Sequence, residues 1–339
     1  MTYSVTDSPV RVYGIPLFSE NKRFERFPES LREKLLSDND KGALTEQIAT
    51  RTVGARAAFR TDSKKIRIEM KLKTLAHDVG MSRFSCSSAA VYTGKGESLA
   101  FCGLAVPGFD DMLGDIEFTT DGKIRDVMIF FPRNEIVEDI KIILDDGAEI
   151  LPPTPYKYEN PVIFFGSSIT EGGHASLVTN AYTALLSQRL DTDYYNFGLS
   201  GSCRGQTDIA EFICTLSPSV LVLDYDHNAP SADFLNETHE KFFRFIREKM
   251  PDLPVIMMST PNFYWIDEAE KRRDVIKKTY ENAVASGDEN VYFIDGSTFF
   301  GEGECHFCTT DTTHPNDYGF HKMADKIEPV LREILEKLN

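Results

Sequence analysis

No stretch of this sequence comes near the roughly 18 consecutive apolar residues that a membrane-spanning helix needs. The first eight residues contain neither a basic segment nor an apolar one, so we expect no signal peptide. Cysteine is also scarce, because six scattered cysteines among 339 residues are too few for a disulfide scaffold. We therefore expect reduced thiols and a cytoplasmic protein.

Basic residues are outnumbered, with 37 lysines and arginines against 53 acidic residues and a net charge of −16. A surface that acidic repels phosphate groups, which argues against nucleic acid and anionic membranes as partners. Apolar residues make up 41% and charged residues 27%, the mixture of a globular protein. The length exceeds one ordinary core and predicts two domains, and the sequence leaves a homo-oligomer open.

The sequence also lacks complete signatures for a nucleotide or a metal. Gly172-Gly173 is not followed by the Lys-Ser/Thr pair of a phosphate-binding loop. Cys305 and Cys308 have the spacing of half a zinc site and His306 could be a third ligand, but no second pair of ligands at such spacing exists. We expect no metal and no cofactor.

The first half of the chain is a series of short strands separated by turn residues, which predicts a β-sandwich. One helix is expected at 28–36. The strands expected from alternating or short apolar patterns are Ala55–Phe59, Ile66–Leu72, Asp115–Phe118, Val127–Phe131 and Ile140–Leu144.

A proline-rich segment follows, with four prolines in the eleven residues 151–161. Proline removes a backbone donor and fixes φ, so we expect a stiff linker without regular structure there. This predicts a β-sandwich accessory domain at 1–152 and a catalytic domain at 160–339.

The second half alternates short apolar runs with amphipathic segments, which predicts a doubly wound α/β domain with a parallel sheet. The expected strands are Val162–Phe165, Tyr194–Phe197, Val220–Leu223, Val255–Met258 and Val291–Ile294. The expected helices are 181–190, 206–214, 236–249, 268–286 and 317–337. Ligands of such domains bind beyond the carboxyl ends of the strands.

Residues suited to acyl transfer follow these strands. Ser168 lies at a strand-to-helix turn, where its hydroxyl would be exposed as a nucleophile. Asp311 and His314 are three residues apart, so a carboxylate can orient an imidazole that activates the serine. The backbone N–H groups of Ser168 and Gly201 and the side chain of Asn228 could form an oxyanion hole.

Four short blocks in this order resemble the SGNH (GDSL-type) hydrolase family. Gly166–Thr170 is similar to the family's Gly-Asp-Ser-x-Ser/Thr block, Asn196–Gly201 to its glycine block, Asp226–Asn228 to its asparagine block and Asp311–His314 to its Asp-x-x-His block. The resemblance implies a three-layer α/β/α, flavodoxin-like catalytic domain. It gives Ser168, Asp311 and His314 the triad roles and Ser168, Gly201 and Asn228 the oxyanion roles.

Two positions depart from the family pattern, because Ser167 replaces the usual aspartate and Ala229 replaces the aspartate after Asn228. Asp226 and His227 also make the pocket more crowded. The two-domain order resembles bacterial members of the family that carry a jelly-roll domain before the hydrolase, several of which are thought to remove acetyl groups from carbohydrates.

Four further residues are candidates for substrate contact, each with a plainer alternative. His174 follows the glycine pair near Ser168, Arg204 follows the glycine block and His227 directly precedes Asn228, but each could instead be an ordinary loop residue. Trp265 is the single tryptophan and could stack on a sugar or simply pack beneath its loop.

We therefore expect a serine esterase that removes short acyl groups, chiefly acetyl, from a small acylated carbohydrate. An acyltransferase would use the same triad. A catalytically silent carbohydrate-binding protein would not need Ser168, Asp311 and His314 together. A lipase is disfavoured because no long apolar lid segment is present.

Overall fold

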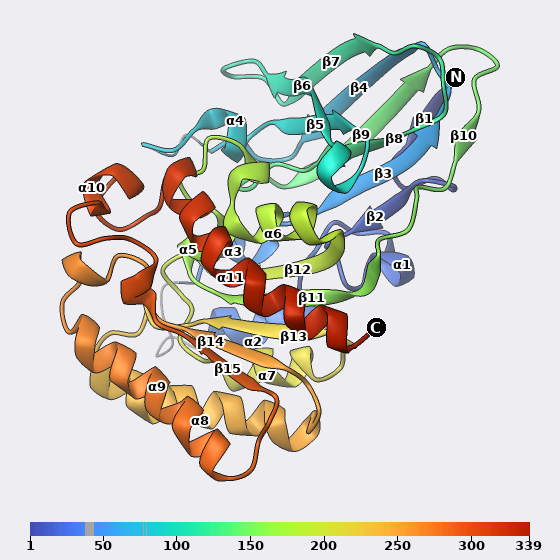
Figure 1. Ribbon diagram of the computed structural model, residues 1–339. Coiled ribbons are helices and arrows are strands. Elements are labelled where there is room, and N and C mark those ends of the chain that lie inside the picture. The colour runs from blue at the N-terminus through green and yellow to red at the C-terminus, as the bar shows by residue number, and fades with distance from the viewer. Residues whose placement is uncertain (38–43, 77, 79) are drawn as a thin grey trace.

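The computed structural model describes residues 1–37, 44–76, 78 and 80–339, and it contains two sheets (Figure 1). The C-terminal sheet has five parallel strands in the order β12-β11-β13-β14-β15. These strands are β11 (Tyr158–Gly166), β12 (Thr192–Gly198), β13 (Val220–Asp224), β14 (Val255–Met258) and β15 (Val291–Ile294). The parallel α/β architecture predicted for this half is confirmed, and its strand order is that of flavodoxin-like folds.

Alternate side chains of these strands enter two separate cores. In β11, Ile163 and Phe165 face one core and Val162 and Phe164 face the other. Two helices pack on the Val162 face, α6 (Tyr182–Leu190) and α11 (Asp317–Lys337). The opposite core includes side chains from α2 (Glu29–Ser37), α7 (Thr207–Ile213), α8 (Ala232–Lys249) and α9 (Ala269–Ala285). Helices thus cover both faces, so this half has three layers (Figure 1).

The linker expectation is wrong at its C-terminal end, because β11 begins at Tyr158 instead of Val162. Tyr158 pairs with Thr192, and the register shifts before the regular ladder resumes at Val162. Pro161 lies inside this irregular stretch, where its carbonyl accepts a hydrogen bond from the Ser219 N–H at 2.9 Å. A proline is tolerated near a strand start when the lost donor falls at a break in the ladder.

The N-terminal half forms one curled antiparallel sheet in the order β1-β9-β4-β7-β6-β5-β8-β3-β10, with β2 paired to β3. The bounds of its strands are β1 Thr2–Ser4, β2 Arg11–Tyr13, β3 Arg56–Thr61, β4 Lys65–Leu72, β5 Ala89–Thr93, β6 Ala100–Pro107, β7 Leu113–Thr119, β8 Arg125–Phe130, β9 Val137–Leu144 and β10 Ile150–Leu151. The core inside the curl includes Ile68 of β4 and Ile129 of β8, which are both fully buried, and a smaller apolar cluster with Tyr92 and Phe130 lies on the opposite face of the sheet. The antiparallel β-domain predicted for this half is confirmed as a curled sheet accompanied by short helices, whereas its jelly-roll topology stays a prediction.

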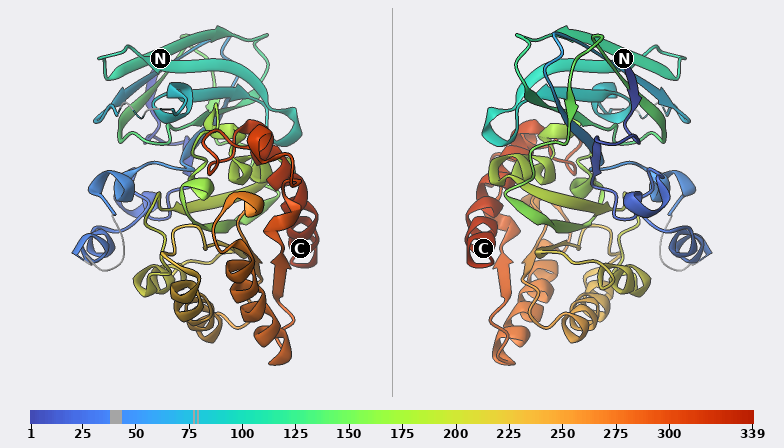
Figure 2. Two further views of the ribbon diagram at one scale, coloured as in Figure 1. Left: turned by 90° about the vertical axis from the view of Figure 1, so that its left-hand side faces the viewer. Right: turned by 90° about the vertical axis from the view of Figure 1, so that its right-hand side faces the viewer.

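The first fifty residues connect the two halves. The described residues between β2 and β3 include the helices α1 (Phe18–Asn21), α2 and α3 (Glu46–Thr50). Phe27, just before α2, contacts Phe197 of β12 with ring centroids 5.1 Å apart. Figure 2 shows these helices, coloured blue, beside the parallel-sheet half. The predicted domain limits are therefore crossed by a shared core, and they stay a prediction.

Buried arginines make further links between the halves. Arg26 is fully buried, and its guanidinium donates to the carbonyls of Asn196 and Gly198 at 2.9 and 2.8 Å. Arg56 of β3 is also fully buried and forms an ion pair with Asp193 of β12. Charged groups are buried only when paired or hydrogen-bonded, so these contacts hold the halves in a fixed relation.

The helices of the described residues include none that is both long and apolar enough to cross a bilayer.

Candidate active site

The turn after β11 presents Ser168. Ser167 begins the short helix α5 (Ser168–Glu171), and its hydroxyl accepts a hydrogen bond from the Ile169 N–H at 3.1 Å. Gly166 ends the strand where a Cβ would lie 2.5 Å from the Asp224 carbonyl, so only glycine fits beside β13. Ser168 is thereby fixed at the first position of a helix with 7% of its surface exposed.

Ser168, His314 and Asp311 form one hydrogen-bonded chain. The Ser168 Oγ lies 2.7 Å from the His314 Nε2, and the His314 Nδ1 lies 2.7 Å from the Asp311 Oδ2. When the Nδ1 proton is donated to Asp311, the Nε2 is free to accept the serine proton. The structure therefore brings the three predicted residues together across 146 positions of sequence.

The turn before α11 holds Asp311 ionised. Partial burial opposes ionisation, but hydrogen bonds from the His314 N–H, the His314 ring and the Thr313 N–H outweigh it and lower the pKa of Asp311 to about 2. Asn316 then caps α11 by accepting from the Gly319 N–H at 3.1 Å. The carboxylate therefore stays charged across the ordinary pH range.

The two other oxyanion candidates follow the neighbouring strands β12 and β13. Gly201 has a φ of +67°, and a Cβ there would meet no atom within 4 Å, so its surroundings are open. The Asn228 Oδ1 accepts from the Cys203 N–H at 3.2 Å, which leaves its amide NH2 free to donate elsewhere. This bond ties the loop after β13 to the loop after β12.

His174 lies against the base. Its ring stacks on that of His314 with centroids 4.8 Å apart, and its Nε2 is 3.6 Å from the Asp311 Oδ2. Burial and the positive charge of protonated His314 lower the pKa of His174. Within the described chain, the ligand atoms of His174, Asp311 and His314 form a group close enough to hold a metal, within 4.8 Å of one another. Cys305 and Cys308 are buried outside this group.

Of the other three candidates for substrate contact, His227 is close enough to the base to be influenced by its charge. Its Nδ1 lies 3.3 Å from the Thr260 Oγ1, and burial together with the charge of His314 lowers the pKa of His227 to about 4. Trp265 ends a short 3-10 turn, Phe263–Trp265, with 42% of its surface exposed and its ring stacked on His306. The preceding Asn262 donates to the Thr312 carbonyl at 2.9 Å and so links this turn to the Asp311–His314 turn.

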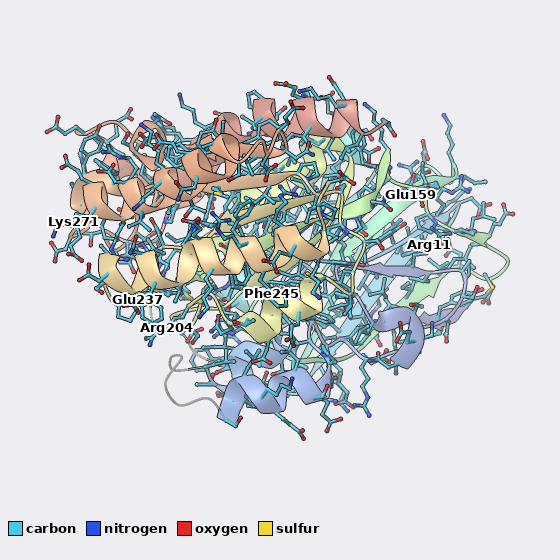
Figure 3. All side chains as sticks on the ribbon, turned by 90° about the horizontal axis from the view of Figure 1, so that it is seen from below. Arg11, Glu159, Arg204, Glu237, Phe245 and Lys271 are labelled. Carbon is cyan, nitrogen blue, oxygen red and sulfur yellow. The ribbon has the colours of Figure 1, made fainter. Side chains whose placement is uncertain are left out.

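Arg204 is placed differently, since no described contact joins its side chain to Ser168 or His314. Its backbone N–H donates to the Gln206 Oε1 at 3.1 Å. In the view from below, Arg204 lies at the same end of the molecule as Glu237 of α8 and Lys271 of α9, opposite Glu159 and Arg11 (Figure 3). This is the end where the strands of the parallel sheet finish.

Three residues near the site were not anticipated from the sequence. Glu171, at the end of α5, is fully buried and pairs with Arg51 and Arg133, both at 3.1 Å. The position of Glu171 three residues after Ser168 is a signal that the sequence offered. No such signal pointed to Arg51 and Arg133, because no local sequence pattern distinguishes a buried arginine from an exposed one.

Comparison with known proteins found a matching family model for each half of the chain. The model of the GDSL-like lipase/acylhydrolase family matches residues 159–332, and the model of the N-terminus of SGNH-hydrolase-type esterases matches residues 2–150. A search of curated proteins gave no match.

Several solved structures share the whole fold. A structure described as a GDSL-like lipase from Bacteroides ovatus has a TM-score of 0.84 at 23% identity, over 99% of this chain and 98% of its own. A salicylyl-acyltransferase from a tetracycline biosynthetic pathway has a TM-score of 0.79 at 18% identity, over 98% and 97%. A family two carbohydrate esterase from Cellvibrio japonicus has a TM-score of 0.62 at 12% identity, over 100% and 99%.

At these identities the solved structures establish the fold, and the family model establishes the class of enzyme. That model covers about half of the 339 residues, including the strand ends that carry Ser168, Gly201, Asn228 and His314. The chain belongs to the GDSL-like lipase/acylhydrolase family and is an esterase of the SGNH type.

Proposed function

We propose that this esterase removes short acyl groups, chiefly acetyl, from an acetylated carbohydrate, with Ser168, His314 and Asp311 as its catalytic triad. The observation that carries the triad is the pair of 2.7 Å contacts from the Ser168 Oγ to the His314 Nε2 and from the His314 Nδ1 to the Asp311 Oδ2. Contacts of this length in this order are what general-base activation of a serine requires.

In the proposed mechanism, the Ser168 Oγ attacks the ester carbonyl while its proton passes to the His314 Nε2. Asp311 holds the imidazole and stabilises its positive charge. The N–H groups of Ser168 and Gly201 and the amide of Asn228 hold the oxyanion. The intermediate expels the alcohol, which takes its proton from His314. Water then attacks the acyl-serine by the same route and releases the carboxylic acid and Ser168.

The acyl and sugar parts of the proposal have separate support. His174 stacks on His314 and so narrows the space beside the base, which favours a small acyl group over a long chain. Trp265 presents an exposed indole near the turn of Asp311, and such a ring can stack on a sugar face. A carbohydrate esterase of family two from Clostridium thermocellum, solved with cellohexaose, shares the fold at a TM-score of 0.59.

The test is hydrolysis of p-nitrophenyl acetate, butyrate and octanoate by wild type, Ser168→Ala and Ser219→Ala. Ser219 is a matched control, because its hydroxyl donates to the Pro161 carbonyl near the amino-terminal ends of β13 and β11, whereas Ser168 follows the carboxyl end of β11. We expect acetate to be cleaved fastest, Ser168→Ala to fall to background and Ser219→Ala to keep full activity. Equal rates for wild type and Ser168→Ala would refute the triad.

Acyl transfer to an alcohol is the second candidate, favoured by the fold shared with the salicylyl-acyltransferase. The same acyl-serine would then react with a sugar hydroxyl in place of water. Adding carbohydrate alcohols to the p-nitrophenyl acetate assay separates the two functions. A transferase forms an acetylated sugar in preference to acetate, whereas a hydrolase releases acetate at an unchanged rate.

A further inference from the structure

The buried carboxylate of Glu171 lies near the site and accepts four hydrogen bonds. Its side chain is 0% exposed, and it accepts hydrogen bonds from the Ser200 N–H at 2.9 Å and the Ser200 Oγ at 2.6 Å. Arg51 and Arg133 each donate to its Oε2 at 3.1 Å. Burial raises the pKa of a carboxyl, but here the three arginines Arg51, Arg133 and Arg26 outweigh it and lower the pKa of Glu171.

This carboxylate lies between the two backbone elements that the reaction uses. It ends the helix that Ser168 begins, and its hydrogen bond to the Ser200 N–H fixes the residue directly before Gly201. The contact is close, since a Cβ on Gly198 would lie 2.7 Å from the Glu171 Cγ. A shift of Glu171 would therefore move α5 and the Ser200–Gly201 turn relative to each other.

The positive partners of Glu171 come from the N-terminal half. Arg51 follows α3, and Arg133 follows β8. Gly173 lies between Arg133 and the base, because a Cβ on Gly173 would lie 3.2 Å from the Arg133 Nη1 and 3.5 Å from the His314 Cδ2. Without these guanidinium groups, an ionised carboxyl with no exposed surface would be strongly disfavoured.

We propose that Glu171 is a positioning residue, held by Arg51 and Arg133, that sets the Gly201 N–H at the distance from Ser168 that the oxyanion needs. The N-terminal half thus contributes to the oxyanion site through the two arginines that bind Glu171. This inference rests on the roles proposed for Ser168 and Gly201. It adds that the oxyanion loop depends on the N-terminal half.

The test uses Glu171→Gln, Ser200→Ala and a control, Tyr92→Phe. Tyr92 makes a buried hydrogen bond of 2.8 Å from the N-terminal half to Thr179 of the other half, away from Glu171. The readouts are kcat and KM for p-nitrophenyl acetate and the inhibition constant of methylboronic acid. The boronate forms a tetrahedral adduct on the serine, and its oxygen takes the oxyanion position.

We expect Glu171→Gln to lower kcat at least ten-fold with KM changed less than three-fold, and to weaken the boronate by a factor similar to the loss in kcat. Ser200→Ala should move both quantities the same way by a smaller factor, and Tyr92→Phe should leave both unchanged. A purely structural role would lower the amount of active enzyme without altering the inhibition constant, which does not depend on enzyme concentration.

If Glu171→Gln does not fold, Ser200→Ala decides, because it removes one donor and leaves both ion pairs intact. The inference is overturned if the folded variants bind the boronate within two-fold of wild type. That result is distinct from failure of the proposed function, in which Ser168→Ala would itself remain active.

Discussion

At the scale of single residues, Asp311 satisfies three donors with one carboxylate. Its Oδ1 accepts from the N–H groups of Thr313 and His314 at 3.1 and 2.7 Å, while its Oδ2 accepts from the His314 ring. The backbone bonds fix the carboxylate, and the carboxylate in turn fixes the imidazole. Orientation and charge are therefore supplied by the same group.

Replacing Asp311 with asparagine should separate these two functions. The amide can still accept from the backbone, but it does not stabilise a charged imidazole and can favour the wrong tautomer. We expect kcat for p-nitrophenyl acetate to fall about 10³- to 10⁴-fold with little change in melting temperature. Asp325→Asn on the outer face of α11 is the control and should keep full activity. A loss below ten-fold would remove Asp311 from the proposed triad.

Asp224 gives a pH prediction for stability. Burial raises the pKa of Asp224 to about 7, although Thr170 and Tyr182 donate to its Oδ2 at 2.7 and 3.0 Å. The unfolded carboxyl has a pKa of about 3.9, so the folded state binds this proton more tightly. The free energy of unfolding contributed by Asp224 therefore falls as pH rises from about 4 to 7 and stays low above that.

Asp224→Asn should remove this dependence. Between pH 5 and pH 8 we expect the stability of wild type to decline relative to the variant by on the order of 2 kcal/mol, measured by urea unfolding at both values. The comparison must be made against the variant, because buried His227 and His239 have lowered pKa values and titrate with the opposite sign over the same range. A difference that is constant with pH would contradict the assignment.

At the scale of elements, α5 and β12 touch through Gly198. A Cβ there would lie 2.7 Å from the Glu171 backbone nitrogen and 2.9 Å from the Ser167 carbonyl oxygen. Both are backbone atoms, so no side-chain rotation can relieve the clash. The four-residue helix is too short to be stable alone, so this contact holds the nucleophile in place.

Gly198→Ala should therefore reduce both stability and activity. We expect a loss of about 1–3 kcal/mol in the free energy of unfolding, as for other overpacked sites, together with a lower kcat. Gly303→Ala is the matched control, because a Cβ at Gly303 meets nothing within 4 Å. Equal behaviour of the two variants in thermal unfolding and ester hydrolysis would show that the contact relaxes at no cost.

The elements also show how far sequence reasoning reaches. All five parallel strands were predicted, because few folds other than a doubly wound α/β domain combine short apolar runs with amphipathic segments in alternation. The carboxyl ends of these strands then directed attention to Ser168 and His314. Strands such as β1 and β6 were missed, since β1 has three residues and β6 carries exposed apolar side chains without a clean alternation. The arginines around Glu171 were missed because burial of a charge depends on distant partners that no local pattern encodes.

At the scale of the whole molecule, the halves are joined by charges as well as by apolar packing. The ion pairs of Arg56 with Asp193 and of Arg133 with Glu171 each join the N-terminal half to the C-terminal half. Removing one member of a buried pair leaves the other without compensation, which costs more than the pair itself contributes.

Arg56→Met should destabilise both halves together. Asp193 would lose its cation, and we expect a loss of about 3–5 kcal/mol in a single cooperative denaturant transition. Arg67→Met is the control, since Arg67 on β4 pairs with Glu69 and Asp115 but is 43% exposed, and exposed pairs contribute about 1 kcal/mol or less. Two separate transitions in wild type would contradict coupled halves.

The burial of Arg26 also bears on how the chain folds as it is made. Two of its acceptors, the carbonyls of Ile48 and Arg51, lie 22 and 25 residues further along, whereas the other two, the carbonyls of Asn196 and Gly198, lie 170 and 172 residues further along. At roughly 5–20 residues per second, about 10–30 s of synthesis separate the arginine from the second pair of acceptors. During that interval the guanidinium has only the acceptors of its own half. The N-terminal strands are thus synthesised early, but the hydrogen bonds of Arg26 to the C-terminal half can form only after β12, which ends at Gly198, has been synthesised.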